Sequence, residues 1–124
     1  MTINKLISNL NTDNADNSII YVCGNSHTYK IGQTTRPACY RMAEIRKIDK
    51  DIQLYGYIQF KANKPMRDLI ESVLRLHMHN LGYTLQGNDH FQKKGHYKTF
   101  KSQAFDIITT TLNDFGIDYI VVNK

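Results

Sequence analysis

The sequence predicts a small α+β fold, in which an antiparallel sheet is flanked by helices. Two apolar stretches, residues 19–23 and 28–32, flank the polar sequence Gly-Asn-Ser-His, which is the usual signal for a β-hairpin. Because the strands of a hairpin are antiparallel, this beginning favours α+β over an alternating parallel fold. The other predicted elements are a helix after Pro37, a strand over 52–60, a helix over 64–81, a helix over 101–115 and a strand over 117–122.

The hairpin brings two chemically useful side chains together if its turn is symmetric. Tyr21 then lies directly opposite Lys30, with Cβ atoms ~5 Å apart on one face of the sheet. Tyr29 points to the other face. A one-residue change of register would place Tyr29 beside Tyr21 instead, so the neighbourhood of Lys30 depends on the turn.

The helix that follows the hairpin carries an arginine on the flank of its apolar face. Thr34 or Thr35 can cap this helix, and Pro37 fits its first turn. Arg41 is ~60° around the helix from the predicted buried face. A single arginine in such a position is usually a surface ion-pair partner. The residues of the buried face are Ala38, Met42 and Ile45.

The next strand and helix are the most regular elements. Residues 52–60 alternate between an apolar face and a tyrosine-rich face, with Gly56 between the two tyrosines. In the helix over 64–81, Glu71 falls at the edge of an apolar stripe, where a packed helix could meet a cleft. The stripe consists of Met66, Ile70, Val73, Leu74, His77 and Leu81. Residues 83–98 read as a loop.

The 124 residues are enough for one domain, which we place at 18–124, preceded by an N-terminal arm over 1–17. Four apolar positions within 1–10 predict a short amphipathic helix in the arm. The arm has a net charge of −1 and the whole chain +5, so the domain carries +6. Such a surplus suits a polyanionic partner, although it sets steering rather than chemistry.

The two cysteines, Cys23 and Cys39, form neither a disulfide framework nor a zinc-ligand set. The first residues lack the continuous apolar run of a signal peptide, and no stretch approaches membrane-spanning length. We therefore expect an intracellular protein that is neither secreted nor bound to a membrane.

Four separated motifs resemble those of the GIY-YIG endonuclease domain. Ile19-Ile20-Tyr21 is similar to the first family motif and Lys30-Ile31-Gly32 to the second. Arg41, nine residues after Gly32, matches the family's helix arginine, and Glu71 matches its metal-binding glutamate. The likeness covers residues 19–91 and is greatest to the compact branch found in phages and large DNA viruses. In this sequence Ile19 replaces the first glycine, and Lys30 replaces the tyrosine of the second motif.

Two further matches come from the compact branch. A histidine follows the glutamate on the same helix, as His77 does here, and an acidic-aromatic signature corresponds loosely to Asp89-His90-Phe91. His77, Asp89, His90, Lys93 and Lys94 are therefore candidates for supporting the site or contacting nucleic acid. On the apolar stripe His77 is more simply a core histidine, and Phe91 a core residue.

The resemblance implies a ββαβα core and a metal-dependent DNA endonuclease that would act in the cytoplasm, or in the nucleus of a host cell if viral. Glu71 would hold one Mg²⁺ or Mn²⁺, and Arg41 would stabilise the phosphate as a donor fork. Tyr21 would be the general base, with Lys30 favouring its phenolate or contacting phosphate. The DNA could be branched or damaged, and a protein partner or a homo-oligomer is compatible with the sequence.

Less specific interpretations remain open at this point. Glu71 stands in an i, i+4, i+8 row with Arg67 and Arg75, and such rows commonly form exposed ion pairs. The second function that we consider is a nuclease-fold module that binds nucleic acid or protein without cutting. A third is a purely structural interaction domain.

Overall fold

A five-stranded antiparallel sheet forms the centre of the residues that the computed structural model describes, 15–87 and 90–123. Its strands, in chain order, are β1 (Asp16–Gly24), β2 (Thr28–Thr34), β3 (Gln53–Ala62), β4 (His90–Gln92) and β5 (Tyr119–Asn123). Across the sheet the order is β4-β2-β1-β3-β5. The described helices are α2 (Ala38–Ile48), α3 (Lys64–Asn80) and α4 (Tyr97–Asp114). The predicted α+β class is confirmed.

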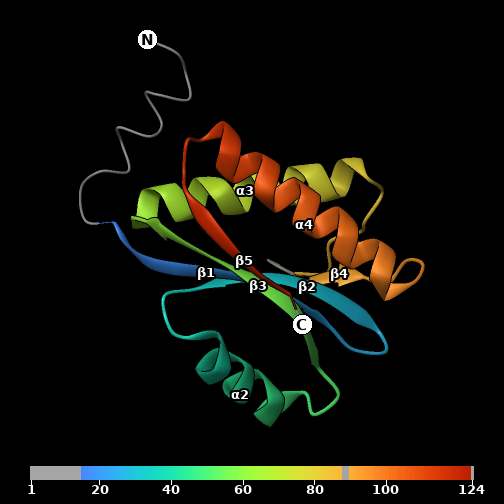
Figure 1. Ribbon diagram of the computed structural model, residues 1–124. Coiled ribbons are helices and arrows are strands. Elements are labelled where there is room, and N and C mark those ends of the chain that lie inside the picture. Colours follow the sequence, from blue (N-terminus) through green and yellow to red (C-terminus); the bar gives the residue numbers. More distant parts are fainter. Residues whose placement is uncertain (1–14, 88–89, 124) are drawn as a thin grey trace.

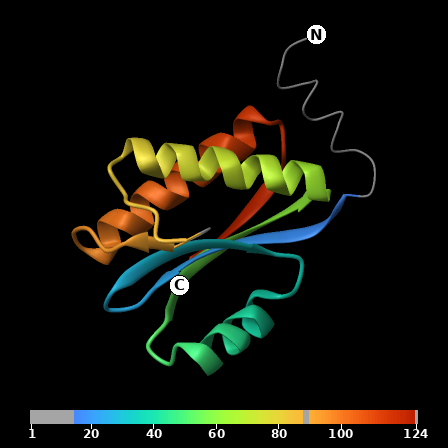
Figure 2. The same cartoon turned by 180° about the vertical axis from the view of Figure 1, so that it is seen from behind.

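The helices cover both faces of the sheet. Helix α2 lies on one face, and α3 and α4 lie on the other (Figures 1 and 2). The α3/α4 face holds the larger core, in which the rings of Tyr29 and Phe100 stack with centroids 4.2 Å apart. The α2 face holds a smaller cluster. Its buried residues are Tyr21, Cys23, Met42 and Ile52.

The alternation that we predicted along β3 is interrupted in the middle of the strand. Val22 pairs with Gly56 but Cys23 pairs with Leu54, so Tyr55 is an extra residue on β3. A bulge of this kind reverses which face the side chains before and after it occupy. Leu54 accordingly packs on the α2 face and Ile58 on the α3/α4 face, so β3 does not have one apolar and one tyrosine-rich face.

The other expectations differ from the structure mainly at element ends. The predicted loop over 83–98 contains β4, because residues 90–92 pair with β2. Helix α4 begins four residues earlier than predicted, where the side chain of His96 accepts a hydrogen bond from the Lys98 N–H at 3.2 Å. Strand β1 begins two residues inside the predicted arm. The predicted helix over 1–10 lies outside the described residues. Within them no helix combines the length and apolar character needed to cross a membrane.

The start of α2 also differs from the prediction. Pro37 is the N-cap residue, and no side chain caps the helix. The Thr34 hydroxyl instead accepts a hydrogen bond from the Arg36 N–H at 3.0 Å, which shapes the connection between β2 and α2.

We expect the larger core to dominate stability. Ile108 is fully buried on α4, so Ile108→Ala should lower the free energy of unfolding by about 2–5 kcal/mol through lost burial and a residual cavity. Ile48→Ala, at a position that is 92% exposed at the end of α2, is the matched control and should change it by less than about 0.5 kcal/mol. Urea unfolding of both variants measures the difference. Equal losses would contradict this account of the core.

Candidate active site

The hairpin brings Tyr21 and Lys30 together, although in a register that differs from the prediction. Tyr21 pairs with Gly32, and Lys30 pairs with Cys23. The difference is two residues, so every side chain stays on its predicted face. Lys30 is diagonal to Tyr21, with its Nζ 5.7 Å from the centroid of the Tyr21 ring. Both are buried, with 1% of Tyr21 and 6% of Lys30 exposed.

The turn explains the change of register. The predicted loop had four residues, whereas the observed turn has two central residues and extends the pairing up to Asn25. The Asn25 N–H donates to the Thr28 carbonyl at 2.9 Å. The Asn25 side-chain oxygen accepts from the N–H groups of His27 and Thr28, both at 2.7 Å. The hydrogen bonds of Asn25 therefore stabilise a tight turn where we predicted a four-residue loop.

Gly32 allows the Tyr21 side chain to reach the outer edge of β2. A Cβ atom at Gly32 would lie 2.1 Å from the Tyr21 hydroxyl oxygen and 2.2 Å from the ring carbon that carries it. The ring thus crosses directly over the glycine backbone. Strand β4 pairs with residues 28–30 of β2, so within residues 15–87 and 90–123 no strand lies on the outer side of the part of β2 beneath the hydroxyl.

Arg41 joins Tyr21 from α2. The pKa of its guanidinium is raised, first by a side-chain hydrogen bond with Tyr21 and further by the charge of Glu44, while partial burial acts in the opposite sense. Arg41 Nη1 lies 3.3 Å from Glu44 Oε2, and the same carboxylate pairs with Arg36. One carboxylate therefore links two arginines beside the tyrosine. Glu44 is not among the predicted site residues, although its i, i+3 spacing from Arg41 in the sequence favours an ion pair.

Glu71 approaches the same edge of β2 from the other face of the sheet. It lines a pocket of about 220 Å³ with Gln33 and Thr34 of β2. Gln33 donates from Nε2 to the Arg67 carbonyl at 2.9 Å, which fixes α3 against this end of the strand. Because residues alternate along a strand, Thr34 shares the face of Tyr21 and Gln33 shares the face of α3. The pocket thus lies where the two faces meet.

In the structure Glu71 is also an ion-pair partner. Its Oε1 lies 3.2 Å from Arg75 Nη2, and just over a third of each side chain is exposed. Arg67, the other basic residue of the predicted row, instead approaches Asp16 at 3.7 Å and donates to the Ala62 carbonyl. Of the two ion pairs expected in this row, the Glu71–Arg75 pair is therefore formed and the Arg67–Glu71 pair is not. An exposed pair of this kind stabilises the fold by ~0.3–0.5 kcal/mol.

The donors around Glu71 suit a hard divalent cation. The described residues contain no group of three or more His, Cys, Asp or Glu side chains that could hold a metal. The pocket instead has oxygen donors from four residues, Glu71, Asp68, Thr34 and Gln33. Two cations, Lys64 and Arg67, complete its lining, and Lys64 is paired with Asp68. The Gln33 Oε1 atom is buried without a hydrogen-bond partner. Oxygen donors with few carboxylates are the set that Mg²⁺ accepts while it keeps several waters.

The supporting candidates lie in different places. His77 is exposed, so its prediction as a core histidine is wrong; Met78 is buried instead. His90 pairs with Lys30 across β2 and β4, which places it on the face of Tyr21. Asp89 lies outside the described residues. Phe91 is 2% exposed, which confirms it as a core residue.

Lys93 and Lys94 lie away from Tyr21, over other aromatic rings. Lys93 Nζ is 5.8 Å from the centroid of the Tyr29 ring, and Lys94 Nζ is 5.0 Å from that of Tyr83. Lys94 also donates to the Leu81 carbonyl at 2.7 Å, at the end of α3. Both lysines are exposed and could still meet a phosphate backbone.

Three other tyrosines are held in the neutral form. Burial raises the pKa of Tyr55 to about 12, and it also raises the pKa values of Tyr29 and Tyr83. Phenols of this kind do not ionise near neutrality and are poor candidates for a general base. The Tyr21 ring has Lys30 near it, and its hydroxyl shares a hydrogen bond with Arg41.

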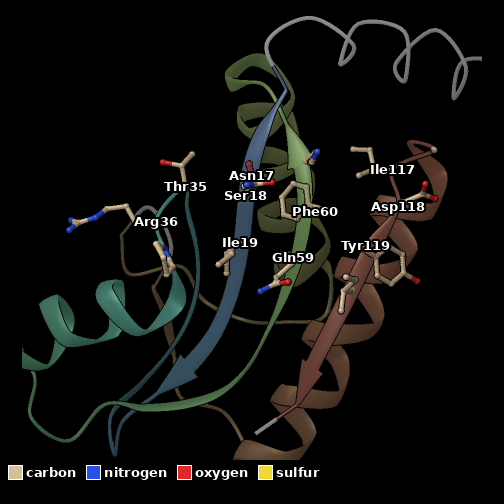
Figure 3. Close-up of a pocket in the computed structure, with 14 residues that line it drawn as sticks. Asn17, Ser18, Ile19, Thr35, Arg36, Gln59, Phe60, Ile117, Asp118 and Tyr119 are labelled. Atoms are coloured by element: carbon tan, nitrogen blue, oxygen red, sulfur yellow. The ribbon is translucent and has the colours of Figure 1, made fainter.

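A wide groove begins beside this cluster and crosses the α2 face of the sheet. Its volume is about 860 Å³. In Figure 3, Thr35 and Arg36 stand on one side, Ile117, Asp118 and Tyr119 stand on the other, and Ile19, Gln59 and Phe60 lie between them. No sequence pattern predicts this groove, because its lining residues come from four separate segments of the chain.

Comparisons of the chain with protein-family models, curated proteins and solved structures found no match.

The crossing of Tyr21 over Gly32 has a measurable consequence. We expect Gly32→Ala to lower the free energy of unfolding by about 1–3 kcal/mol, because the new methyl group collides with the ring. In a Tyr21→Leu background the ring is gone, so the same substitution should cost much less. A double-mutant cycle measured by urea unfolding gives this coupling. Additive effects of the two substitutions would contradict the observed crossing.

Proposed function

We propose that this chain is a small metal-dependent DNA endonuclease of the GIY-YIG type that hydrolyses phosphodiester bonds. One observation carries the proposal. Tyr21, Lys30 and Arg41 gather on one face beside the open edge of β2, and the Glu71 pocket lies at that same edge. The order strand–strand–helix–strand–helix, which the family resemblance implies, agrees with β1 to α3.

The residues at the edge match the needs of phosphodiester hydrolysis. Glu71, with Gln33 and Thr34, would hold a single Mg²⁺ or Mn²⁺. When bound, the ion would neutralise charge on the phosphate and lower the pKa of a coordinated water. Of the two carboxylates in the pocket lining, Asp68 is paired with Lys64, which leaves Glu71 for a metal and favours one ion over two.

The tyrosine and the two cations have separate roles in this proposal. The Tyr21 oxygen, held at the edge by the gap at Gly32, would accept the proton of the attacking water. Arg41 would donate two parallel N–H bonds to the phosphate, with Glu44 setting its orientation. Lys30 would supply positive charge beside the phenol, where the family carries a second tyrosine.

A second function has its own supporting observation. Glu71 is already paired with Arg75, and that pair is compatible with a module that binds nucleic acid without cutting it. In such a module the basic surface would remain important and the Glu71 pocket would not. Cleavage assays separate the two functions.

Glu71 is the residue whose loss should abolish cutting. We expect Glu71→Gln to eliminate nicking of supercoiled plasmid and branched DNA in Mg²⁺ or Mn²⁺. The substitution removes the one carboxylate of the described pocket lining that has no lysine partner. Asp68→Asn is the matched control, since Asp68 lies one turn earlier on α3 and pairs with Lys64 at 2.9 Å. It should retain most of the activity.

The assay also separates the two functions. Undiminished nicking by Glu71→Gln would remove this residue as the metal ligand. Absence of nicking by the unmodified chain, together with DNA binding, would favour the non-cutting module.

The Tyr21 hydroxyl should matter for cutting and little for binding. Tyr21→Phe keeps the ring over Gly32 but removes the proton acceptor, so we expect the nicking rate to fall by about 10²-fold or more. DNA affinity, measured in EDTA, should stay within a factor of about two. Tyr40→Phe, at an exposed position on α2, is the control and should cut normally. Equal rates for the two variants would exclude Tyr21 as the base.

A further inference from the structure

We propose that the groove on the α2 face binds an unpaired stretch of the DNA strand next to the bond to be cut. We call it the sheet groove; it is lined by residues 17–19, 35–37, 59–61 and 116–120. This inference rests on the proposed function and names its substrate class: DNA with a single-stranded flap, branch or bubble, rather than a continuous duplex.

The sheet groove lies next to the candidate active site on the same face of the sheet. Ile19 lies two residues before Tyr21 on the same face of β1, which is about 7 Å along the strand. Its neighbours across the sheet are Gln59 on β3 and Ile120 on β5. Figure 3 shows Ile19 and Gln59 between the two sides of the groove. A DNA strand with a phosphate at Tyr21 can therefore continue across these residues toward β5.

The floor of the groove is apolar and its sides are polar. Ile19 and Ile120 face the groove, and Ile120 is 63% exposed. Asn17 and Gln59 place amide groups beside them, and each amide can both donate and accept hydrogen bonds. An apolar floor with a few amides suits the flat face and polar edge of a nucleobase.

The charges at the rim favour a polyanion. Arg36 and Lys61 line the groove from opposite sides of β1, and Asp118 is the acidic residue of the lining. Arg36 is held by Glu44, the carboxylate that also contacts Arg41. The Glu44 side chain would therefore connect a phosphate bound at Arg36 to Arg41 in the candidate active site.

The apolar floor argues for an unpaired strand. In a duplex the faces of the bases are covered by their stacked neighbours, so that only base edges and phosphates can meet a protein. In single-stranded DNA the base faces are exposed and can pack on side chains. The groove spans β1 to β5, two strand spacings or about 10 Å, which suits one strand of bases.

Fluorescence anisotropy in EDTA tests this inference without cleavage. The probe is a fluorescein-labelled oligothymidylate of about 12 nucleotides, a length within the ~4–16 nucleotides of single-strand sites. Gln59→Glu places a negative charge in the groove with little change of shape, and Gln53→Glu makes the same change on the same strand outside it. We expect about tenfold weaker binding for Gln59→Glu and a change of less than about twofold for Gln53→Glu.

A second pair of variants uses the edge strand. Ile120→Glu alters the groove, whereas Val121→Glu alters the opposite face of β5, where 40% of the side chain is exposed. The first should weaken binding about tenfold and the second should not. An unlabelled duplex of equal length should compete poorly. Wild-type affinity in both groove variants, or equal competition by duplex, would overturn the inference.

These outcomes are distinct from those of the proposed function. If the chain nicks plasmid DNA but the groove variants bind normally, the endonuclease stands and the single-strand subsite fails. If the groove variants lose binding but the unmodified chain never nicks DNA, the subsite stands as a binding site and the endonuclease fails.

Discussion

The close crossing of Tyr21 over Gly32 is the constraint on which the candidate site depends. Only a residue without a side chain leaves room for the ring, and the ring brings its hydroxyl to the part of β2 that no described strand covers. Arg41 meets the hydroxyl there from α2. The pocket of Glu71 opens at the same end of the strand, from a helix on the other face. Without an open edge, residues on the two faces of the sheet could not act on one phosphate.

The two faces of the sheet have different tasks. The α3/α4 face contains most of the buried apolar side chains and fixes the position of α3. The α2 face is only partly covered, so it retains a small buried cluster around Tyr21 and a groove beyond it. Glu44 connects these two regions because it contacts both Arg41 and Arg36. An uneven distribution of packing thus leaves an open groove on the α2 face while the rest of the domain is stabilised.

The sequence predicted the helices and strands better than the pairing and packing between them. Periodicity located the hairpin, the long helix and the closing strand, because those patterns depend on local geometry. It missed the hairpin register, which depends on the hydrogen bonds of one asparagine, and the bulge at Tyr55, which appears only when β1 and β3 pair. The helical phase correctly placed Glu71 at the edge of a packed face. It was wrong for His77, which is exposed, while the neighbouring Met78 is buried. The contact between Arg36 and Glu44, which are eight residues apart, becomes visible only in the folded chain.

The central claim is that Tyr21 and Glu71 serve one site around the edge of β2. Mn²⁺ added to protein labelled with 3-fluorotyrosine tests it directly, since a paramagnetic ion broadens nearby ¹⁹F signals. The account predicts strong broadening of the Tyr21 signal and loss of this broadening in Glu71→Gln. The signal of Tyr97 should broaden little, because Tyr97 stacks on Tyr55 near the hairpin turn, away from Gly32. A Tyr21 signal that Mn²⁺ leaves sharp, or broadens equally in Glu71→Gln, would contradict the shared site.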